Sequence, residues 1–212
     1  MKGSVLIKIC GMRETANLED VCALNPDLVG FIYVPSSRRY VGSRPDPALF
    51  RLPGPGIGKV GVFVDAPREE VMRIANRDQL DFIQLHGKEN PDFCRELCVG
   101  GLSVIKVLNP FDPEAAGSPE AYAPWIRYFL FDTPGPGHGG TGQIFDWDLL
   151  QEVSLPRPFF LSGGIGPDSL SSLQSFGHPN LAGLDVNSRF ETSPGRKDVG
   201  RLREFIHQIR QF

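Results

Sequence analysis

Seven polar or reactive side chains lie within otherwise apolar segments of this chain, close to the point where each segment ends. Six of them form pairs separated by two positions, as Lys8 and Cys10 do in the segment VLIKIC. Residues two apart lie on the same face of a β-strand. Thiol, amine, imidazole and carboxylate groups are also the groups with which enzymes transfer protons. The residues are Lys8, Cys10, Gln84, His86, Asp132, Asp185 and Asn187.

Eight short apolar or aromatic segments would supply the strands that position these side chains. They are VLIKIC, LVGFIYV, KVGVFVD, DFIQLHG, SVIKVL, YFLFDT, PFFLSGG and LAGLDVNS. Their ends follow one another at intervals of 21 to 31 residues. Such an interval holds one strand, one helix and two short loops.

Helices are predicted between several of these strands. Pro67 suits a first helical turn and is followed by acidic residues, and the final segment carries an apolar stripe at helical spacing. The patterns predict helices over residues 66–77, 90–98, 166–176 and 197–212, with weaker patterns over 42–53 and 146–153.

Strands that alternate with helices predict a parallel sheet. Because eight units fill residues 1–212 without a linker, we predict an α/β protein with one domain, a (β/α)8 TIM barrel. Active sites of such barrels lie at the C-terminal ends of the strands, where the seven side chains above would meet. We expect Lys106 in the fifth strand and Asp65 at the end of the third to face the same pocket. This convergence favours an enzyme.

Two glycine-containing loops predict a phosphate site. LSGGIGPDSL follows the seventh strand and DVNSRFETSPG follows the eighth, and these two loops form the common phosphate site of TIM barrels. We expect the ligands to be backbone N–H groups of Gly163, Gly164, Asn187, Ser188 and Arg189.

Two other motifs carry less weight, and we expect neither a metal nor a cofactor. GPGHGG, residues 135–140, matches the G-x-G-x-x-G pattern, but no helix opens on its third glycine and no acid follows about 20 residues later. Cys94 and Cys98 lie four apart, yet no second cluster of Cys or His completes a zinc site. A glycine-rich loop at the active site explains the first motif better.

Composition restricts the partners and the compartment. The net charge is −3 and the sequence pI is about 5.8, so we expect binding neither to nucleic acid nor to membranes. Four cysteines without an export signal predict a cytoplasmic protein. The two loops above predict a small phosphorylated partner, and both a monomer and a homodimer are consistent with the sequence.

Seven segments carry a resemblance to a known family, in the family's order and spacing. They are KICGM, GFIYVPSSRRYV, VGVFVD, IQLHG, FDTPGPGHGGTGQIFDW, LSGGIGPDSL and GLDVNSRFETSPGRKD. Over its full length the chain resembles the phosphoribosylanthranilate isomerase family. The resemblance implies an isomerase of tryptophan biosynthesis. Its reaction would be the Amadori rearrangement of N-(5-phosphoribosyl)anthranilate to 1-(2-carboxyphenylamino)-1-deoxyribulose 5-phosphate.

The resemblance also implies roles for individual residues. Cys10 of the K-I-C-G motif matches the family's general base, and Asp132 of the D-T motif matches its general acid. Arg39 matches the arginine that binds the anthranilate carboxylate, and His86 and Asp185 match substrate contacts. We expect two neighbours on the same strand faces, Lys8 and Gln84, to belong to the substrate site as well.

The chain departs from the family pattern at two places. Arg38 stands where the family often has proline or lysine, so either Arg38 or Arg39 could hold the carboxylate. Arg189 stands where the family commonly has glycine. It would either change the backbone of the phosphate loop or add a cation beside it.

The implied reaction requires one acid and one base. Opening the furanose ring needs a proton on the ring oxygen, which a positioned carboxylic acid can deliver. A base must then remove the C2′ proton, and a thiolate can do so if its pKa moves towards the working pH. We expect the Lys8 cation to lower the pKa of Cys10.

Other functions stay open at this point. A Schiff-base aldolase would use Lys106 as its nucleophile. A sugar-phosphate epimerase on the same fold would suit the cysteine–aspartate pair less well. A binding protein for phosphosugars without catalytic activity would use the same loops.

Overall fold

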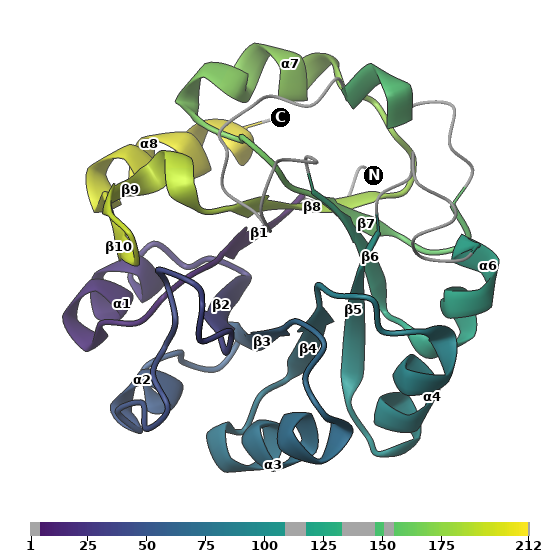
Figure 1. Cartoon of the computed structure of the whole chain (residues 1–212). Helices are drawn as coiled ribbons and strands as arrows, with labels where there is room; N and C mark the ends of the chain where they lie inside the picture. The colour runs from purple at the N-terminus through teal and green to yellow at the C-terminus, as the bar shows by residue number, and fades with distance from the viewer. Residues whose placement is uncertain (1–4, 109–117, 133–146, 151–154, 212) are drawn as a thin grey trace.

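Eight parallel strands close into a barrel in the computed structural model, which describes residues 5–108, 118–132, 147–150 and 155–211 (Figure 1). Each of the eight predicted apolar segments corresponds to one of these strands, and only β3 begins one residue before its segment. The strands are β1 (Leu6–Ile9), β2 (Leu28–Ile32), β3 (Gly58–Phe63), β4 (Phe82–Leu85), β5 (Ser103–Leu108), β6 (Tyr128–Phe131), β7 (Phe159–Leu161) and β8 (Leu181–Val186).

The barrel is closed by the pairing of β1 with β8, in which Lys8 lies opposite Asp185. Consecutive strands pair in order around the ring, from β1 with β2 to β7 with β8. The (β/α)8 barrel predicted from the sequence is confirmed.

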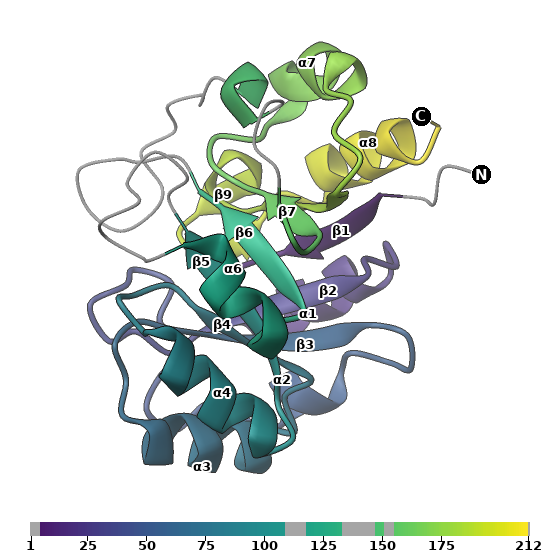
Figure 2. The same ribbon diagram turned by 90° about the vertical axis from the view of Figure 1, so that its right-hand side faces the viewer.

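Helices lie outside the barrel, and Figure 2 shows them from the side. The α-helices are α1 (Thr15–Cys22), α2 (Ala48–Arg51), α3 (Arg68–Asp78), α4 (Pro91–Val99), α6 (Pro119–Tyr122), α7 (Leu170–Ser175) and α8 (Val199–Ile209). The 3₁₀ turns are η1 (Ala123–Trp125), η2 (Trp147–Leu150), η3 (Pro167–Ser169) and η4 (Ser188–Phe190). No helix among the described residues is long and apolar enough to cross a membrane.

The four stronger helix predictions are confirmed, as α3, α4, α7 with η3, and α8. The weaker ones shrink to the four residues of α2 and to η2, and residues 151–154 lie outside the described residues. The sequence patterns missed α1 and α6. They also missed a hairpin after β8, formed by β9 (Glu191–Ser193) and β10 (Arg196–Lys197).

The core has two layers because alternate residues of each strand point to opposite sides. Inside the barrel, one apolar layer is formed by Leu28, Val60, Ile105, Leu130 and Phe160. The larger apolar layer packs between the strands and the helices. Polar side chains of the inward-facing positions lie further along the strands, beyond the inner apolar layer.

Candidate active site

A buried ion pair connects the two strands that close the barrel. Lys8 Nζ lies 2.9 Å from Asp185 Oδ2, and the two side chains are 0% and 6% exposed. Burial alone would lower the pKa of Lys8, but Asp185 and the neighbouring Cys10 outweigh it and the pKa of Lys8 is raised. Burial raises the pKa of Asp185, against the effect of Lys8. Lys8 therefore stays protonated beside Asp185.

The Cys10 thiol interacts with Lys8 of this pair, and Cys10 follows β1 directly. Its backbone N–H donates to Val186 O at 2.9 Å, and the next residue, Gly11, has a φ of +82°. A side chain at Gly11 would collide with Arg39 and Asn187. A glycine is therefore needed for the chain to turn away from the strand and leave the thiol at its end.

The expectation that Lys8 brings the thiol towards neutral pH needs correction. Lys8 lowers the pKa of Cys10, as predicted, and Lys197 lowers it too. Burial is the larger effect, however, and Asp185 adds to it, so the net pKa of Cys10 is raised. Without ligand the thiol is protonated near neutral pH.

Space for the sulfur comes from Gly30 in β2. A methyl group at Gly30 would lie 2.8 Å from Cys10 Sγ and 3.2 Å from its Cα. We expect Gly30→Ala to displace the thiol and lower kcat by about 10–10²-fold, because the resemblance implies that Cys10 is the base and small misplacements of a reacting group are costly. Steady-state kinetics measure the effect, and circular dichroism checks the fold. An unchanged kcat would show that the rate does not depend on the exact position of the Cys10 thiol.

A second group of polar side chains lies at the C-terminal ends of β4, β6 and β7. His86 Nε2 is 3.4 Å from Asp132 Oδ2, and Ser162 Oγ donates to Asp132 Oδ1 at 3.3 Å. Gln84 Nε2 lies 3.5 Å from His86 Nδ1. The buried Gln84 Oε1 has no hydrogen-bond partner in the described part of the chain. Gln84, His86 and Asp132 thus lie together, as the strand alternation predicted.

Asp185 interacts electrostatically with both groups of side chains, the one around Cys10 and the one around Asp132. Asp132 raises the pKa of Asp185 and His86 lowers it, after the larger effects of burial and Lys8. The second carboxylate oxygen of Asp185, Oδ1, is buried without a hydrogen-bond partner among the described residues. Cys10, Lys8, Asp185, His86 and Asp132 therefore occupy one end of one barrel.

The predicted phosphate loops show one clear feature of an anion site. Gly163 and Gly164 have φ angles of +84° and +68°, a conformation that favours glycine at both positions. No acceptor in the described part of the chain receives their backbone N–H groups. Successive N–H groups left free in this way form concavities that bind anions.

Two of the three residues after β8 are held by other side chains. Asn187 Oδ1 accepts from Lys197 Nζ at 2.7 Å, and Ser188 begins η4. The Arg189 guanidinium pairs with Asp168 of η3. Arg189 has no positive φ, so it fits this backbone without strain, and its cation is neutralised by Asp168.

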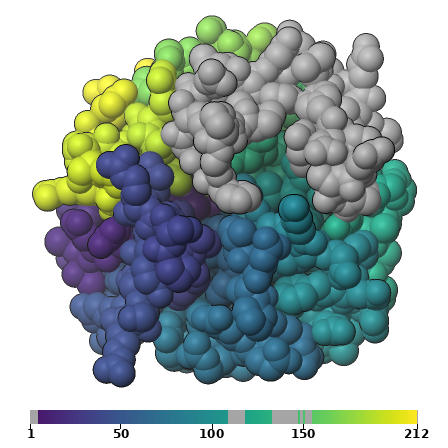
Figure 3. All heavy atoms as spheres, in the orientation of Figure 1, coloured from purple at the N-terminus to yellow at the C-terminus, as the bar shows by residue number. Residues whose placement is uncertain are grey.

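Arg39 is joined to the hairpin after β8 by a bidentate ion pair. Its Nε lies 2.9 Å and its Nη2 lies 2.6 Å from the carboxylate of Glu191. Lys197 Nζ approaches the same carboxylate at 2.8 Å. Figure 3 shows the surface of this contact, where the yellow C-terminal part of the chain meets the dark blue segment after β2.

The comparisons with known proteins agree with this geometry. The family model described as N-(5'phosphoribosyl)anthranilate (PRA) isomerase matches residues 7–208. The N-(5'-phosphoribosyl)anthranilate isomerase of Phocaeicola vulgatus is 42% identical, with 98% of each chain covered. The chain belongs to the phosphoribosylanthranilate isomerase family.

Solved structures of the phosphoribosylanthranilate isomerase family share the fold. The Thermotoga maritima enzyme is 32% identical and superposes with a TM-score of 0.79. The match spans 98% of the present chain and 100% of the Thermotoga maritima chain. A phosphoribosylanthranilate isomerase in complex with reduced 1-(o-carboxyphenylamino)-1-deoxyribulose 5-phosphate is 30% identical. It covers 98% of this chain and 100% of its own, with a TM-score of 0.74.

The sequence analysis missed two charged residues that contact the candidate site residues Arg39 and Asn187, namely Glu191 and Lys197. The segment of Glu191 was interpreted only as a loop, and Lys197 was predicted to begin the final helix, whereas it lies in β10. The sequence ETSPGRK places Pro194 and Gly195 between short polar runs, which is a hairpin signal. That signal predicts a cross-strand contact of Glu191 with Lys197, but it says nothing about Arg39.

The prediction that Lys106 faces the pocket was wrong. Lys106 pairs in register with Leu85 and Phe129, which belong to the outer apolar layer. Its ammonium donates to Glu89 Oε2 at 2.9 Å and to Gly87 O at 2.7 Å. An amine so placed is not available to form a Schiff base in the barrel of a phosphoribosylanthranilate isomerase.

Asp65 binds the loop after β4 instead of facing the pocket. Its carboxylate accepts the backbone N–H of Lys88 at 2.6 Å, while its own N–H donates to Glu89. Among the described residues there is no group of three or more His, Cys, Asp or Glu side chains that could hold a metal ion.

Proposed function

We propose that Cys10 is the general base and Asp132 the general acid of the isomerase. Family membership makes the chain an N-(5'-phosphoribosyl)anthranilate isomerase, and the proposal concerns how this chain's residues carry out the reaction. The supporting observation is that a thiol after β1 and a carboxylic acid after β6 lie at the same end of a closed barrel. Asp185 interacts electrostatically with both of them, and Lys8 interacts with Cys10 and Asp185.

The first step of the Amadori rearrangement opens the ribose ring. Asp132, protonated in the substrate complex, gives its proton to the ring oxygen as the bond from that oxygen to C1′ breaks. The nitrogen lone pair forms the iminium at C1′. His86 and Ser162 hold the carboxyl group in place for this transfer.

The second step removes the proton from C2′. Cys10 takes that proton as a thiolate, and the electrons move to give an enamine with a hydroxyl group at C2′, which tautomerises to the ketose. Burial raises the pKa of the thiol, so the thiolate forms only with help from nearby cations. Lys8 and Lys197 supply that help. We propose that Lys8 acts on the substrate through Cys10 and Asp185, since its ammonium has no exposed surface.

Binding would use both ends of the substrate. The N–H groups of Gly163 and Gly164, which no acceptor among the described residues receives, suit the phosphate together with the backbone from Asn187 to Arg189. Gln84, His86 and Asp185 carry polar atoms into the mouth between the two ends.

Arg39 is the arginine we assign to the anthranilate carboxylate. Its guanidinium is held inside the site, whereas Arg38 is exposed and its carbonyl accepts from Arg13. We expect Arg39→Ala to raise KM by about 10–10²-fold, as loss of a bidentate contact to carboxylate would. Arg38→Ala, its matched control, should change KM less than about twofold. A larger effect at Arg38 would exchange the two roles.

A fluorescence assay with freshly generated phosphoribosylanthranilate tests the function directly. The anthranilate group reports its own conversion, so the expected result is a change in fluorescence that depends on the enzyme. Absence of turnover, with ligand-induced thermal stabilisation retained, would favour a protein that binds phosphosugars without converting them. Borohydride trapping of a substrate adduct on Lys106 would instead support a Schiff-base aldolase.

The setting of the enzyme completes the proposal. We place it in the cytoplasm, which the four free thiols support because disulfides are rare there. We propose that residues 1–212 act as one domain, as a monomer or homodimer, on a phosphosugar and without a cofactor. Sedimentation velocity distinguishes the two oligomeric states.

A further inference from the structure

One carboxylate holds two cations beside the catalytic thiol. Glu191, the first residue of β9, accepts from Arg39 through both Nε and Nη2, from Lys197 at 2.8 Å and from the backbone N–H of Gly195 at 3.0 Å. The Glu191 side chain is 5% exposed and the Lys197 side chain is fully buried. This cluster joins the loop after β2 to the hairpin after β8.

Such an arrangement is not the simplest way to stabilise a hairpin. Burying charges costs desolvation energy, and apolar residues of similar size often stabilise a fold as well or better. The hairpin already has other attachments, since Asn17 of α1 accepts from Lys197 N at 2.7 Å and donates to Lys197 O at 3.0 Å. A role in the chemistry would explain why charges occupy this position.

The geometry of Arg39 points to the first part of that role. A guanidinium has five N–H groups in one plane, and Glu191 uses only the edge that carries Nε. On the opposite edge, Nη1 donates to no acceptor among the residues that the structure describes, and Nη2 is bonded only to Glu191. Glu191 thus fixes the plane of the guanidinium and leaves one edge for a second carboxylate.

The position of Lys197 points to the second part. Its ammonium is held by Glu191 and by Asn187 Oδ1, and its charge acts on the Cys10 thiol. Burial lowers the pKa of Lys197, and Glu191 opposes this change more than any other group does. Loss of the Glu191 charge would therefore favour a neutral amine beside Cys10.

We propose that Glu191 is a positioning residue with two tasks: it orients Arg39 towards the substrate carboxylate, and it keeps Lys197 charged beside Cys10. The inference rests on the proposed function, because it presumes that Cys10 and Arg39 act on the substrate. Glu191 itself does not touch the reacting atoms.

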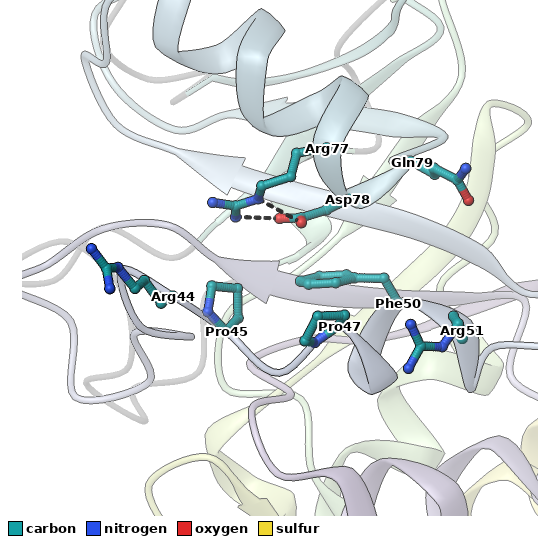
Figure 4. Close-up of a pocket in the computed structure, with 8 residues that line it drawn as sticks. All are labelled: Arg44, Pro45, Pro47, Phe50, Arg51, Arg77, Asp78 and Gln79. Carbon is teal, nitrogen blue, oxygen red and sulfur yellow. Dashed lines mark hydrogen bonds and ion pairs between the residues drawn. The ribbon is translucent and has the colours of Figure 1, made fainter.

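The test compares Glu191→Gln with a control of matched geometry. In the pocket of Figure 4, Asp78 accepts from Nε and Nη2 of Arg77 and from the hydroxyl of Tyr33. Its side chain is also 5% exposed, and its Nη2–Oδ2 distance is also 2.6 Å. This pocket of about 440 Å³ lies between α2 and α3 and is lined by Arg44, Pro45, Pro47, Phe50, Arg51, Arg77, Asp78 and Gln79. Asp78→Asn therefore removes an equivalent charge away from the barrel mouth.

Glu191→Gln should raise KM about tenfold, the factor for a loss of 1.4 kcal/mol in binding. It should also slow the alkylation of Cys10 by iodoacetamide, with the midpoint of its pH profile moved upward. Mapping by mass spectrometry separates Cys10 from the other three thiols. Asp78→Asn should lower Tm by about as much as Glu191→Gln does, and it should leave KM and the alkylation profile unchanged.

Two further variants separate the tasks. Lys197→Met should slow Cys10 alkylation in the same direction as Glu191→Gln while KM rises less. Glu191→Asp, which keeps the charge, should recover part of both effects.

The outcomes distinguish this inference from the proposed function. A wild-type chain without turnover would refute the function. A wild-type chain with turnover, beside a Glu191→Gln variant whose KM and alkylation profile match Asp78→Asn, would overturn the positioning role alone. A downward shift of the alkylation midpoint in Glu191→Gln would overturn the part that concerns Lys197.

Discussion

Replacing Cys10 by alanine should lower kcat by about 10²–10⁴-fold, the usual contribution of a positioned acid or base. KM should change little, because the thiol takes part in proton removal and not in holding the phosphate or the carboxylate. A change confined to kcat indicates an interaction made only in the transition state. Stopped assays with high enzyme concentrations measure the residual rate.

Cys98→Ala is the control for this variant. Cys98 lies on α4 and is exposed, so its removal should leave both kcat and KM unchanged. Cys10→Ser keeps nearly the same volume but replaces the thiol by a far weaker acid, and we expect it to be as slow as Cys10→Ala. A near-normal kcat in either Cys10 variant would remove the thiol from the mechanism.

The pH dependence of the thiol gives an independent check. Burial holds the pKa of Cys10 above the ordinary value for a thiol. Alkylation of the free enzyme at Cys10 should accordingly be slow near neutral pH and rise only at higher pH. A thiol that is alkylated rapidly at pH 7 would contradict the burial seen in the structure.

The sequence predicted those features that depend on local alternation. Lys8 and Cys10 alternate with the apolar residues Ile7 and Ile9. The sequence therefore shows clearly which face of this strand is polar. The strand SVIKVL is apolar on both faces, so alternation alone did not decide where Lys106 points. In the folded chain Ile105 belongs to the layer inside the barrel, and Lys106 therefore faces outward.

Contacts between distant parts of the chain could not be predicted in this way. Arg39 and Glu191 are 152 residues apart, and no periodicity connects them. The state of the Cys10 thiol is equally a tertiary property. A lysine two residues away predicts a lowered pKa, whereas the depth of burial, which the sequence does not specify, determines the net direction.

Replacing Asp132 by asparagine should also lower kcat by about 10²–10⁴-fold, because the amide cannot deliver a proton to the ring oxygen. The substitution keeps the shape of the side chain, and its oxygen can still accept from Ser162. Binding of the substrate should thus persist. Steady-state kinetics give kcat, and titration with a product analogue gives the affinity.

His86 is the neighbour that could be mistaken for the acid, since its Nε2 lies 3.4 Å from Asp132 Oδ2. If His86 only positions Asp132, His86→Asn should lower kcat by about tenfold, and the double variant should be no slower than Asp132→Asn alone. Effects that multiply would instead show an independent role for the imidazole. A His86 variant slower than the Asp132 variant would transfer the acid role to His86. The carboxyl position at the end of β6 favours Asp132, because Ser162 and His86 both hold it from the side.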